Sequence, residues 1–265
     1  MKHENWQVAE IIRVEKLMLG KNDFYSMKKN GEAISMVTVY DTAFARIAEA
    51  AKIDMLLVGD SAANTMLGME RTAGISMEAM CLFTSAVKRG APNSYIVSDM
   101  PYGSDTEPKL ALQNATKLLE AGAHAVKIEG LPLESLKALR EKKIEIVGHL
   151  GLLPQTAKSF KQVGKSDEEA EKIIEQAKIL DSLNPCAVVL EHIPELLGEK
   201  VSRAINAPTI GIGAGRQTDG QVLVMHDILL MHPFKLPPFA KSFANFWEAG
   251  VNAFCDYKNW VCKKN

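Results

Sequence analysis

Five short apolar runs in this sequence end in residues that can hold charge or bind a ligand. These residues are Asp60 and Ser61 after Val58, Asp99 after Val97, Lys127 and Glu129 around Ile128, His149 after Val147, and Glu191 after Leu190. In a parallel β-barrel the C-terminal ends of the strands meet at one mouth, so these side chains would converge there. A single acid after a strand more often caps the next helix, but five successive polar strand ends favour an active site.

Three of these residues, Asp60, Asp99 and Glu129, are carboxylates that would repel one another at a shared mouth. A cation or a shared proton would relieve the repulsion, and oxygen ligands without a nearby cysteine favour Mg²⁺ or another hard ion over zinc. The alternative is a purely structural ion-pair network in which Lys127 and His149 neutralise the carboxylates. We favour the metal because buried charge networks are costly where no function retains them.

A glycine-rich segment, Gly211-Ile-Gly213-Ala-Gly215, follows the seventh apolar run. Barrels often hold a phosphate against backbone amides at this position. Glycines at a tight strand exit explain the segment at least as well. His192 and the pair His226-Asp227 stand beside apolar neighbours, and we expect hydrogen-bonded structural histidines at both places.

The composition excludes several classes of protein. Lys and Arg (31) nearly balance Asp and Glu (32), so the net charge of −1 offers no bulk charge for binding a nucleic acid. No apolar run reaches the roughly 18 residues of a membrane-spanning helix. Four cysteines (Cys81, Cys186, Cys255 and Cys262) match neither zinc nor disulfide spacing. Residues 1–16 lack an export signal, so we expect a cytoplasmic protein.

Apolar runs alternate with segments of helical period, which is the pattern of a parallel α/β fold. The predicted strands are Ile34–Val39, Met55–Val58, Tyr95–Val97, Ala125–Ile128, Ile144–Val147, Ala187–Leu190, Thr209–Ile212 and, more weakly, Gln221–Met225 before a helical His226–Met231. The predicted helices are Asp41–Ala51, Ser76–Lys88, a helix from Thr106 to Gly122, Leu133–Lys142, Asp167–Leu183 and Glu195–Ile205. Thr106 is the predicted cap of the third helix, and Ser166 with Glu169 forms a capping box.

No linker, low-complexity tract or long repeat interrupts this alternation, so residues 1–265 are predicted to form a single (β/α)8 barrel domain. A helical extension is predicted from about 239 to 262. Its apolar stripe, which we expect to pack on the barrel or on another subunit, consists of Phe243, Phe246, Trp247, Val251, Phe254 and Trp260.

Several segments, taken in order, resemble the ketopantoate hydroxymethyltransferase family. They are Ile34-Ser-Met-Val-Thr-Val-Tyr-Asp41, Val58-Gly-Asp-Ser61, Ser98-Asp-Met-Pro101, Val126-Lys-Ile-Glu-Gly130, Gly148-His-Leu-Gly-Leu152 with Pro154-Gln155, Val189-Leu-Glu191 and Pro208 through Asp227. The resemblance implies a TIM barrel of the phosphoenolpyruvate/pyruvate-like superfamily, one Mg²⁺ per subunit and a homo-oligomer, typically a decamer. It also implies that 3-methyl-2-oxobutanoate, 5,10-methylenetetrahydrofolate and water give 2-dehydropantoate and tetrahydrofolate, on the route to pantothenate and coenzyme A.

The resemblance also implies a role for each residue at the strand ends. Metal-binding positions of the family fall on Asp60, Asp99 and Glu129, oxo-acid positions on Asp60, Ser61, Asp99, Lys127 and His149, and the general base on Glu191. The chemistry fits these types. A 2-oxo acid can chelate Mg²⁺, Glu191 can remove the proton from its branched carbon, and Lys127 can offset the negative charge of the resulting enolate.

Two segments depart from the family pattern: Ala62 to Thr72 after Ser61, and the shortened loop from Ser159 to Gly164. Because such loops control closure, a lyase or mutase of the same superfamily, acting on another 2-oxo acid or a phosphonate, is the main alternative. Such lyases often use a cysteine in a mobile loop near the mouth, which no cysteine here matches. A non-catalytic paralogue is a third alternative, although it would be expected to lose the base and the carboxylates.

Overall fold

The computed structural model describes residues 18–263. The prediction that the chain lacks an export signal concerns residues 1–16, which lie outside this range. Within it, no helix is long and apolar enough to span a membrane.

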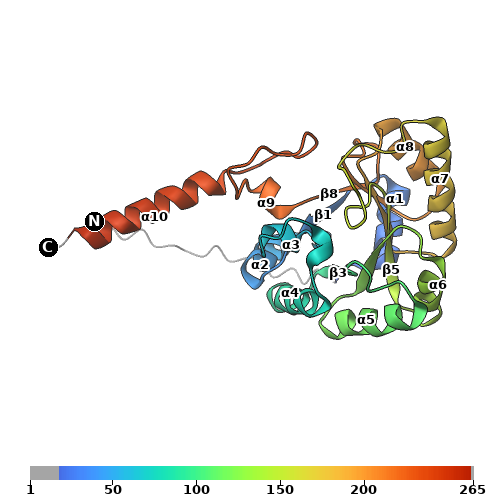
Figure 1. Cartoon of the computed structure of the whole chain (residues 1–265), viewed down its shortest axis with the longest axis horizontal. Coiled ribbons are helices and arrows are strands. Elements are labelled where there is room, and N and C mark those ends of the chain that lie inside the picture. Colours follow the sequence, from blue (N-terminus) through green and yellow to red (C-terminus); the bar gives the residue numbers. More distant parts are fainter. Residues whose placement is uncertain (1–17, 264–265) are drawn as a thin grey trace.

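Eight parallel strands close into a barrel in the order in which they occur along the chain (Figure 1). They are β1 (Ile34–Thr38), β2 (Met55–Val58), β3 (Tyr95–Asp99), β4 (Ala125–Glu129), β5 (Glu145–Gly151), β6 (Ala187–Glu191), β7 (Thr209–Ile212) and β8 (Gly220–Leu223). The pairing of β8 with β1, from Gly220 opposite Ile34 to Leu223 opposite Val37, closes the ring. The (β/α)8 fold predicted from the sequence is therefore confirmed.

Helices cover the outside of the barrel. They are α2 (Thr42–Ala50), α3 (Ala62–Thr65), the 3₁₀ helix Thr72–Gly74, α4 (Met77–Gly90), α5 (Pro108–Glu120), α6 (Leu133–Glu141), α7 (Asp167–Ser182), α8 (Glu195–Ala204) and α9 (Met225–Ile228). Among the described residues no helix separates β7 from β8. The two strands are joined by a loop that contains the glycine-rich segment.

Two predicted helix caps differ in detail from the structure. Helix α5 begins at Pro108 with Glu107 as its N-cap residue, while the Thr106 hydroxyl donates to the carbonyl of Gly103. Proline at the first helical position has no N–H to satisfy, so the side-chain cap is dispensable there. Ser166 accepts from the Glu169 amide as predicted, but the Glu169 carboxylate accepts from Gly164 and Lys165 and does not close the box.

The barrel has separate cores inside and outside its wall. Met36, Leu57, Val97 and Val189 fill the interior together with other alternate strand residues, whereas Val37, Leu56, Ile96 and Val188 point outward and pack against the helices. This alternation follows from the two-residue period of a strand.

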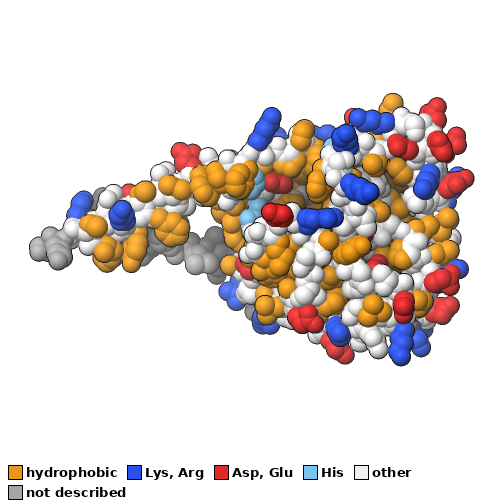
Figure 2. All heavy atoms as spheres, in the orientation of Figure 1, with side chains coloured by type: hydrophobic (Ala, Val, Ile, Leu, Met, Phe, Trp, Pro, Cys, Tyr) orange, Lys and Arg blue, Asp and Glu red, His pale blue; other side chains and the backbone are white. Residues whose placement is uncertain are grey.

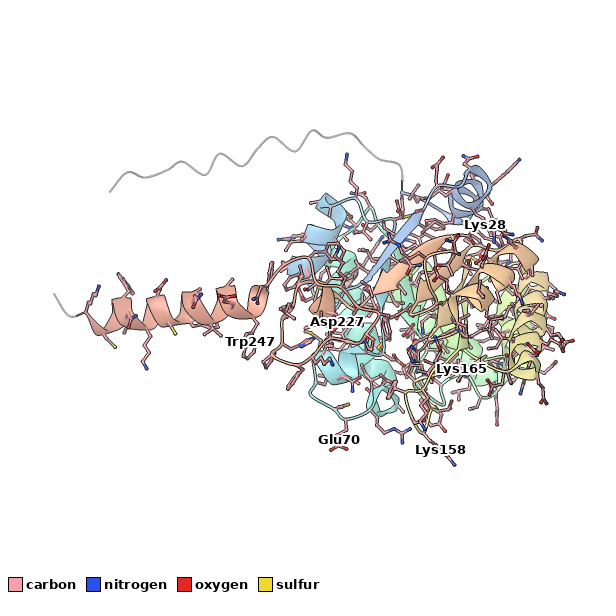
Figure 3. The ribbon with its side chains drawn as sticks, turned by 90° about the horizontal axis from the view of Figure 1, so that it is seen from above. Lys28, Glu70, Lys158, Lys165, Asp227 and Trp247 are labelled. Carbon is pink, nitrogen blue, oxygen red and sulfur yellow. The ribbon has the colours of Figure 1, made fainter. Side chains whose placement is uncertain are left out.

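Helix α1 (Lys21–Asn30) closes the N-terminal end of the barrel. Its Phe24 is fully buried among the interior residues and meets Tyr95 edge to face at 5.1 Å. Figure 3 shows Lys28 of α1 toward one end of the molecule and Glu70 and Lys158, on the loops after β2 and β5, toward the other. With one end closed by α1, only the C-terminal mouth is available for a site.

The C-terminal helix α10 (Phe246–Cys262) extends away from the barrel, and no residue in it is buried (Figures 1 and 2). It starts later than the predicted boundary near 239, because the segment before it is hydrogen-bonded to α9: the amide of Phe243 donates to the carbonyl of Ile228. The first two residues of α10, Phe246 and Trp247, donate from their amides to the carbonyls of Leu229 and Leu230. The apolar stripe predicted for this segment is exposed. At its start Phe246 lies beside Phe44 of α2 on the same chain, whereas the rest of the stripe extends away from the barrel.

The first prediction concerns His124, which precedes β4. Its Nδ1 accepts a hydrogen bond from the amide of Ile96, and burial, with the Lys88 charge as a second cause, lowers its pKa to about 4. A lowered histidine pKa stabilises the fold above the unfolded value of about 6.5, and this contribution is lost as the pH falls through 4. For a half-buried ring we expect a loss of roughly 1–2 kcal/mol between pH 6.5 and pH 4.

His124→Asn keeps an acceptor for the Ile96 amide without a titrating group. Its free energy of unfolding in urea should therefore fall less than that of the wild type over this pH range. Equal pH slopes for the two proteins would contradict the assignment.

Candidate active site

The strand ends bring all the predicted site residues to the C-terminal mouth of the barrel. Asp60 follows β2, Asp99 ends β3, Lys127 and Glu129 lie on β4, His149 lies on β5, and Glu191 ends β6. The strand register sets Asp99 opposite Lys127, Glu129 opposite His149 and Gly151 opposite Glu191. The prediction that these residues converge is confirmed by their positions.

Asp99 is the most tightly held carboxylate of the group. Its Oδ1 lies 3.0 Å from the Lys127 ammonium and its Oδ2 accepts from the backbone amide of Asp60 at 2.9 Å. Lys127 and Asp99 are both almost fully buried, and the pKa of Lys127 is raised: burial opposes its charge, but Asp99 and the other carboxylates outweigh that effect. The contact between Lys127 and Oδ1 lacks hydrogen-bond geometry, so this buried oxygen keeps acceptor capacity.

Asp60 lies close to Asp99, and its negative charge is less well compensated by its neighbours. Burial and, next, the charge of Asp99 raise its pKa to about 7, against the opposing effect of Lys127. In water an aspartate ionises near pH 4, so the folded protein makes ionisation of this group costly. A cation shared by Asp60 and Asp99 would remove that cost.

His149 lies between two glutamates on neighbouring strands. Its Nδ1 is 3.4 Å from Glu129 and its Nε2 is 3.2 Å from Glu191. Burial and the Lys127 ammonium, 3.3 Å from Nδ1, both disfavour a charged ring, but the two carboxylates prevail and raise the pKa to about 9. The two carboxylates therefore favour the charged form of His149, which acts as a counter-ion beside Lys127.

Glu129 is turned toward this histidine. Burial alone would raise its pKa, but the hydrogen bond and charge of His149, with Lys127 and the Gln155 amide, lower it below the ordinary value. Among residues 18–263 no three His, Cys, Asp or Glu side chains form a ready-made coordination group. The pair Asp60 and Asp99 still fits Mg²⁺, which commonly takes one or two carboxylates and completes its shell with water and substrate.

Glu191 is the most accessible acid of this group, with 16% of its side chain exposed. Its backbone closely approaches β5, where a Cβ on Gly151 would lie 2.2 Å from the Glu191 carbonyl oxygen. Gly151 also has a φ of 94°, so both its conformation and the close approach require glycine there. The glycine at this position lets β5 and β6 deliver His149 and Glu191 side by side.

Ser61 is oriented by residues that the sequence analysis did not single out. The Tyr40 hydroxyl lies 2.8 Å from the Ser61 hydroxyl and donates to Thr38, which accepts from the amide of Met225. Tyr40 is fully buried, and burial raises its pKa to about 12. Tyr40 and Gln155 both lie in the segments that resemble the family. Their position as polar residues past a strand end is the sequence pattern that could have identified them as site residues.

The other candidates have different surroundings. In the glycine-rich segment, Gly213 and Gly215 have positive φ, and a Cβ on Gly215 would lie 2.2 Å from Glu195, so tight packing accounts for the glycines. His192 and His226 were expected to be hydrogen-bonded, yet the buried Nδ1 of each has no partner. Both rings instead contact aromatic rings, Phe239 and Tyr40 respectively.

Solved structures share the fold of this chain. A phosphonopyruvate hydrolase, solved as a complex with oxalate and Mg²⁺, matches with a TM-score of 0.61 and 10% identity, covering 92% of this chain and 87% of its own. A 2,3-dimethylmalate lyase of the phosphoenolpyruvate mutase/isocitrate lyase superfamily matches with a TM-score of 0.57 and 13% identity over 91% and 87%. The chain thus has the barrel fold of this superfamily.

Sequence relatives identify the family. The family model for ketopantoate hydroxymethyltransferase matches residues 19–265. Three relatives, each called 3-methyl-2-oxobutanoate hydroxymethyltransferase, come from Geobacillus kaustophilus (42% identity, 91% of this chain and 88% of the relative), Listeria innocua (44%, 90% and 89%) and Thermotoga maritima (43%, 89% and 89%). The chain belongs to the ketopantoate hydroxymethyltransferase family and is a transferase of that class, which confirms the resemblance.

The second prediction concerns the raised pKa of the Asp60 carboxylate. A raised aspartate pKa means that the folded state holds a proton which the unfolded state releases, so stability falls as the pH rises from about 4 through 7. Asp60→Asn removes this cost. In the presence of EDTA, the stability gap between Asp60→Asn and the wild type should widen by roughly 2 kcal/mol from pH 5 to pH 8.

Urea denaturation at the two pH values measures this gap. Asp256→Asn, on the exposed surface of α10, is the matched control and should show no such widening. If the gap for Asp60→Asn did not depend on pH, burial and the charge of Asp99 would not raise the pKa of Asp60.

Proposed function

We propose that this chain transfers the one-carbon unit of 5,10-methylenetetrahydrofolate to 3-methyl-2-oxobutanoate, giving 2-dehydropantoate for pantothenate and coenzyme A synthesis. The observation that carries the proposal is the placement of Glu191 within one mouth that also holds the buried pair of Asp99 and Lys127. That arrangement supplies a base and a fixed positive charge for making an enolate. The names of the relatives agree with this chemistry.

Mg²⁺ is the metal we propose, one per subunit, with Asp60 and Asp99 as its carboxylates and Glu129 as the third family position. The raised pKa of Asp60 and the available Asp99 Oδ1 support an extra cation at this place. The phosphonopyruvate hydrolase with a similar fold was solved with Mg²⁺ and oxalate. Bound Mg²⁺ would act as a Lewis acid toward the carboxylate and keto oxygens of the oxo acid.

The residues of the chain then take distinct roles. Glu191 accepts the proton from C3 of the oxo acid, and Lys127 provides positive charge where the enolate oxygen becomes negative. His149, whose Nε2 lies 3.2 Å from Glu191, orients that carboxylate into the mouth. Ser61, oriented by Tyr40, holds the substrate carboxylate. The enolate carbon attacks the methylene carbon of the folate as one of its carbon–nitrogen bonds breaks. Water then replaces the other nitrogen, which leaves the hydroxymethyl group on the oxo acid and releases tetrahydrofolate, so no covalent enzyme intermediate is required.

The positions of the cysteines argue against the lyase alternative. Cys81 lies on α4, Cys186 directly precedes β6 at the N-terminal end of the barrel, and Cys255 and Cys262 lie on α10. None of the four lies at the C-terminal mouth, where a catalytic cysteine would have to reach substrate. All four are free, which supports the cytoplasm as the proposed location.

The third prediction tests the base. With Mg²⁺, the wild type should exchange the C3 proton of 3-methyl-2-oxobutanoate with deuterated solvent, and added methylenetetrahydrofolate should convert the oxo acid to 2-dehydropantoate. Glu191→Gln should slow exchange by at least about 100-fold, the contribution typical of a general base, with oxo-acid binding nearly unchanged. NMR measures exchange and calorimetry measures binding.

A control with the same substitution is Glu248→Gln on α10, which should exchange at the wild-type rate. Wild-type exchange in Glu191→Gln would eliminate Glu191 as the base. Absence of exchange and of product in the wild type would eliminate the transferase itself.

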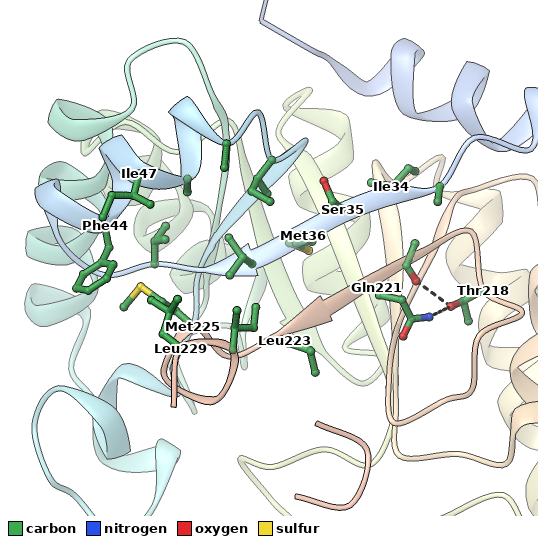
Figure 4. A pocket seen from close by; sticks show the side chains of 18 of the residues that line it. Ile34, Ser35, Met36, Phe44, Ile47, Thr218, Gln221, Leu223, Met225 and Leu229 are labelled. Atoms are coloured by element: carbon green, nitrogen blue, oxygen red, sulfur yellow. Dashed lines mark hydrogen bonds between the residues drawn. The ribbon is translucent and has the colours of Figure 1, made fainter. Parts of the chain in front are cut away.

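We also propose a homo-oligomer, and the groove beside α10 supports this proposal. A helix that follows the eighth strand ordinarily packs on the barrel wall, but α10 extends away from it (Figure 1). The uncovered place is an apolar groove of about 500 Å³ between β1, β8, α2 and α9, lined by Phe44, Ile47, Met225 and Leu229 among others (Figure 4). The protein therefore presents an uncovered wall and an exposed apolar helix.

The two surfaces fit each other between copies of the chain. Helix α10 has 17 residues, about 26 Å, with large apolar side chains such as Phe254 and Trp260 mostly exposed. It starts beside the groove, where the ring centroids of Phe246 and Phe44 lie 6.4 Å apart. The N-terminal end of α10 adjoins the groove. Two chains can therefore exchange their α10 helices reciprocally and bury the groove and the apolar helix of each chain in one isologous contact. The decamer implied by the family resemblance would be built from such pairs.

The fourth prediction concerns this assembly. Val251→Glu with Phe254→Glu on α10, and separately Ile47→Glu in the groove, should each convert the wild-type oligomer to smaller species in light scattering. Burying an unpaired carboxylate in either surface is too costly for the contact to persist. Leu196→Glu on α8, a residue that is 71% exposed, is the control and should assemble normally. A monomeric wild type, or variants of unchanged mass, would contradict the exchange.

A further inference from the structure

Gln155 joins the loops that carry the three carboxylates. It follows β5 in a short turn, where the amides of Thr156 and Ala157 both donate to the carbonyl of Leu153. Its side-chain Nε2 donates to Asp60 Oδ2 at 2.9 Å and to the carbonyl of Met100 at 3.0 Å, and its backbone amide donates to Glu129 Oε2 at 3.1 Å. One residue therefore links the segments that follow β2, β3, β4 and β5.

Both hydrogens of the Gln155 amide group are used, and this fixes its orientation. Its two partners, a carboxylate and a carbonyl, are both acceptors, so a reversed amide would set oxygen against oxygen. Gln155 is only 7% exposed, so no bulk water replaces these bonds. A hydrogen bond to an ionised carboxylate in such surroundings is among the stronger kinds.

The position of the Asp60 carboxylate depends on Gln155 more than Asp99 or Glu129 depends on any one side chain. Asp99 is held by Lys127 and by the Asp60 amide, and Glu129 is held by His149 and by the Gln155 amide. For the Asp60 carboxylate, Gln155 provides the side-chain hydrogen bond, and it does so against repulsion from Asp99. Without it, the carboxylate would turn away from Asp99 and toward water.

We propose that Gln155 is a positioning residue that holds Asp60 beside Asp99, and that it thereby sets the affinity of the site for Mg²⁺. This inference rests on the proposed metal site. Residues that orient a metal ligand typically change metal affinity by 10- to 100-fold when they are removed. Since both hydrogens of the Gln155 amide are engaged by Asp60 and Met100, its loss should act through Asp60 and Mg²⁺ binding rather than through the proton transfer.

The test is Gln155→Met, which keeps the length of the side chain and removes both donors. Titration calorimetry of the metal-free protein with Mg²⁺ should show binding weakened about 10-fold in a variant that still unfolds cooperatively. The Mg²⁺ concentration that gives half-maximal deuterium exchange should rise equally, and kcat should recover at saturating Mg²⁺. Gln113→Met on the exposed face of α5 is the matched control. It should bind Mg²⁺ as the wild type does.

A second variant covers the case in which Gln155→Met does not fold. Gln155→Asn keeps the amide and the backbone hydrogen bond to Glu129, but is one carbon too short to reach Asp60, so it should show the same loss of affinity. Wild-type Mg²⁺ affinity in a folded variant would overturn the inference and leave the proposed function standing. If the wild type itself bound no Mg²⁺, the metal proposal would fail, and a crystal structure of the variant with Asp60 unmoved would overturn the positioning role as well.

Discussion

The mouth of this barrel is organised by one constraint, the burial of several carboxylates within reach of one another. Asp60, Asp99 and Glu129 lie where water cannot screen their charges, and unpaired burial of ions is among the largest costs a fold can incur. The chain meets it with two cations, Lys127 and His149, and with donors from Gln155 and from the Asp60 amide. These compensate Asp99 and Glu129 well and Asp60 poorly, so the unmet part of the cost is concentrated where a divalent cation is proposed.

His149 connects this group of buried charges to the proposed base. It links Glu129 on β4 to Glu191 on β6, since its two ring nitrogens face these two carboxylates. The hydrogen bond and charge of His149 lower the pKa of Glu129, and the same ring faces Glu191. The stability that the charged His149 contributes is full below the unfolded pKa of about 6.5 and is lost as the pH rises from there through about 9.

Much of this could be predicted from the sequence because a parallel barrel turns order along the chain into position in space. Asp60, Asp99, Glu129 and Glu191 each directly follow or end an apolar run, so their convergence required only the fold class. Gln155 and Tyr40 were not predicted, since their importance lies in hydrogen bonds between loops, and loop geometry has no period to read. Thr106 and the start of α10 were misplaced for a related reason: Pro108 and the hydrogen bonds from Phe243 to α9 are local competitors that a helical pattern does not reveal.

The groove and the mouth belong to one hydrogen-bonded unit. Met225 lines the groove, and its backbone amide donates to Thr38, which also accepts from Tyr40, which in turn contacts Ser61. The start of α9 thus fixes both one wall of the groove and, through two buried hydroxyls, the serine at the mouth. A helix seated in the groove would pack on Met225 and so restrain the strand ends of β8 and β1 together. In the proposed assembly, the Met225 amide that borders the groove would therefore also orient, through Thr38 and Tyr40, the residue proposed to hold the substrate carboxylate.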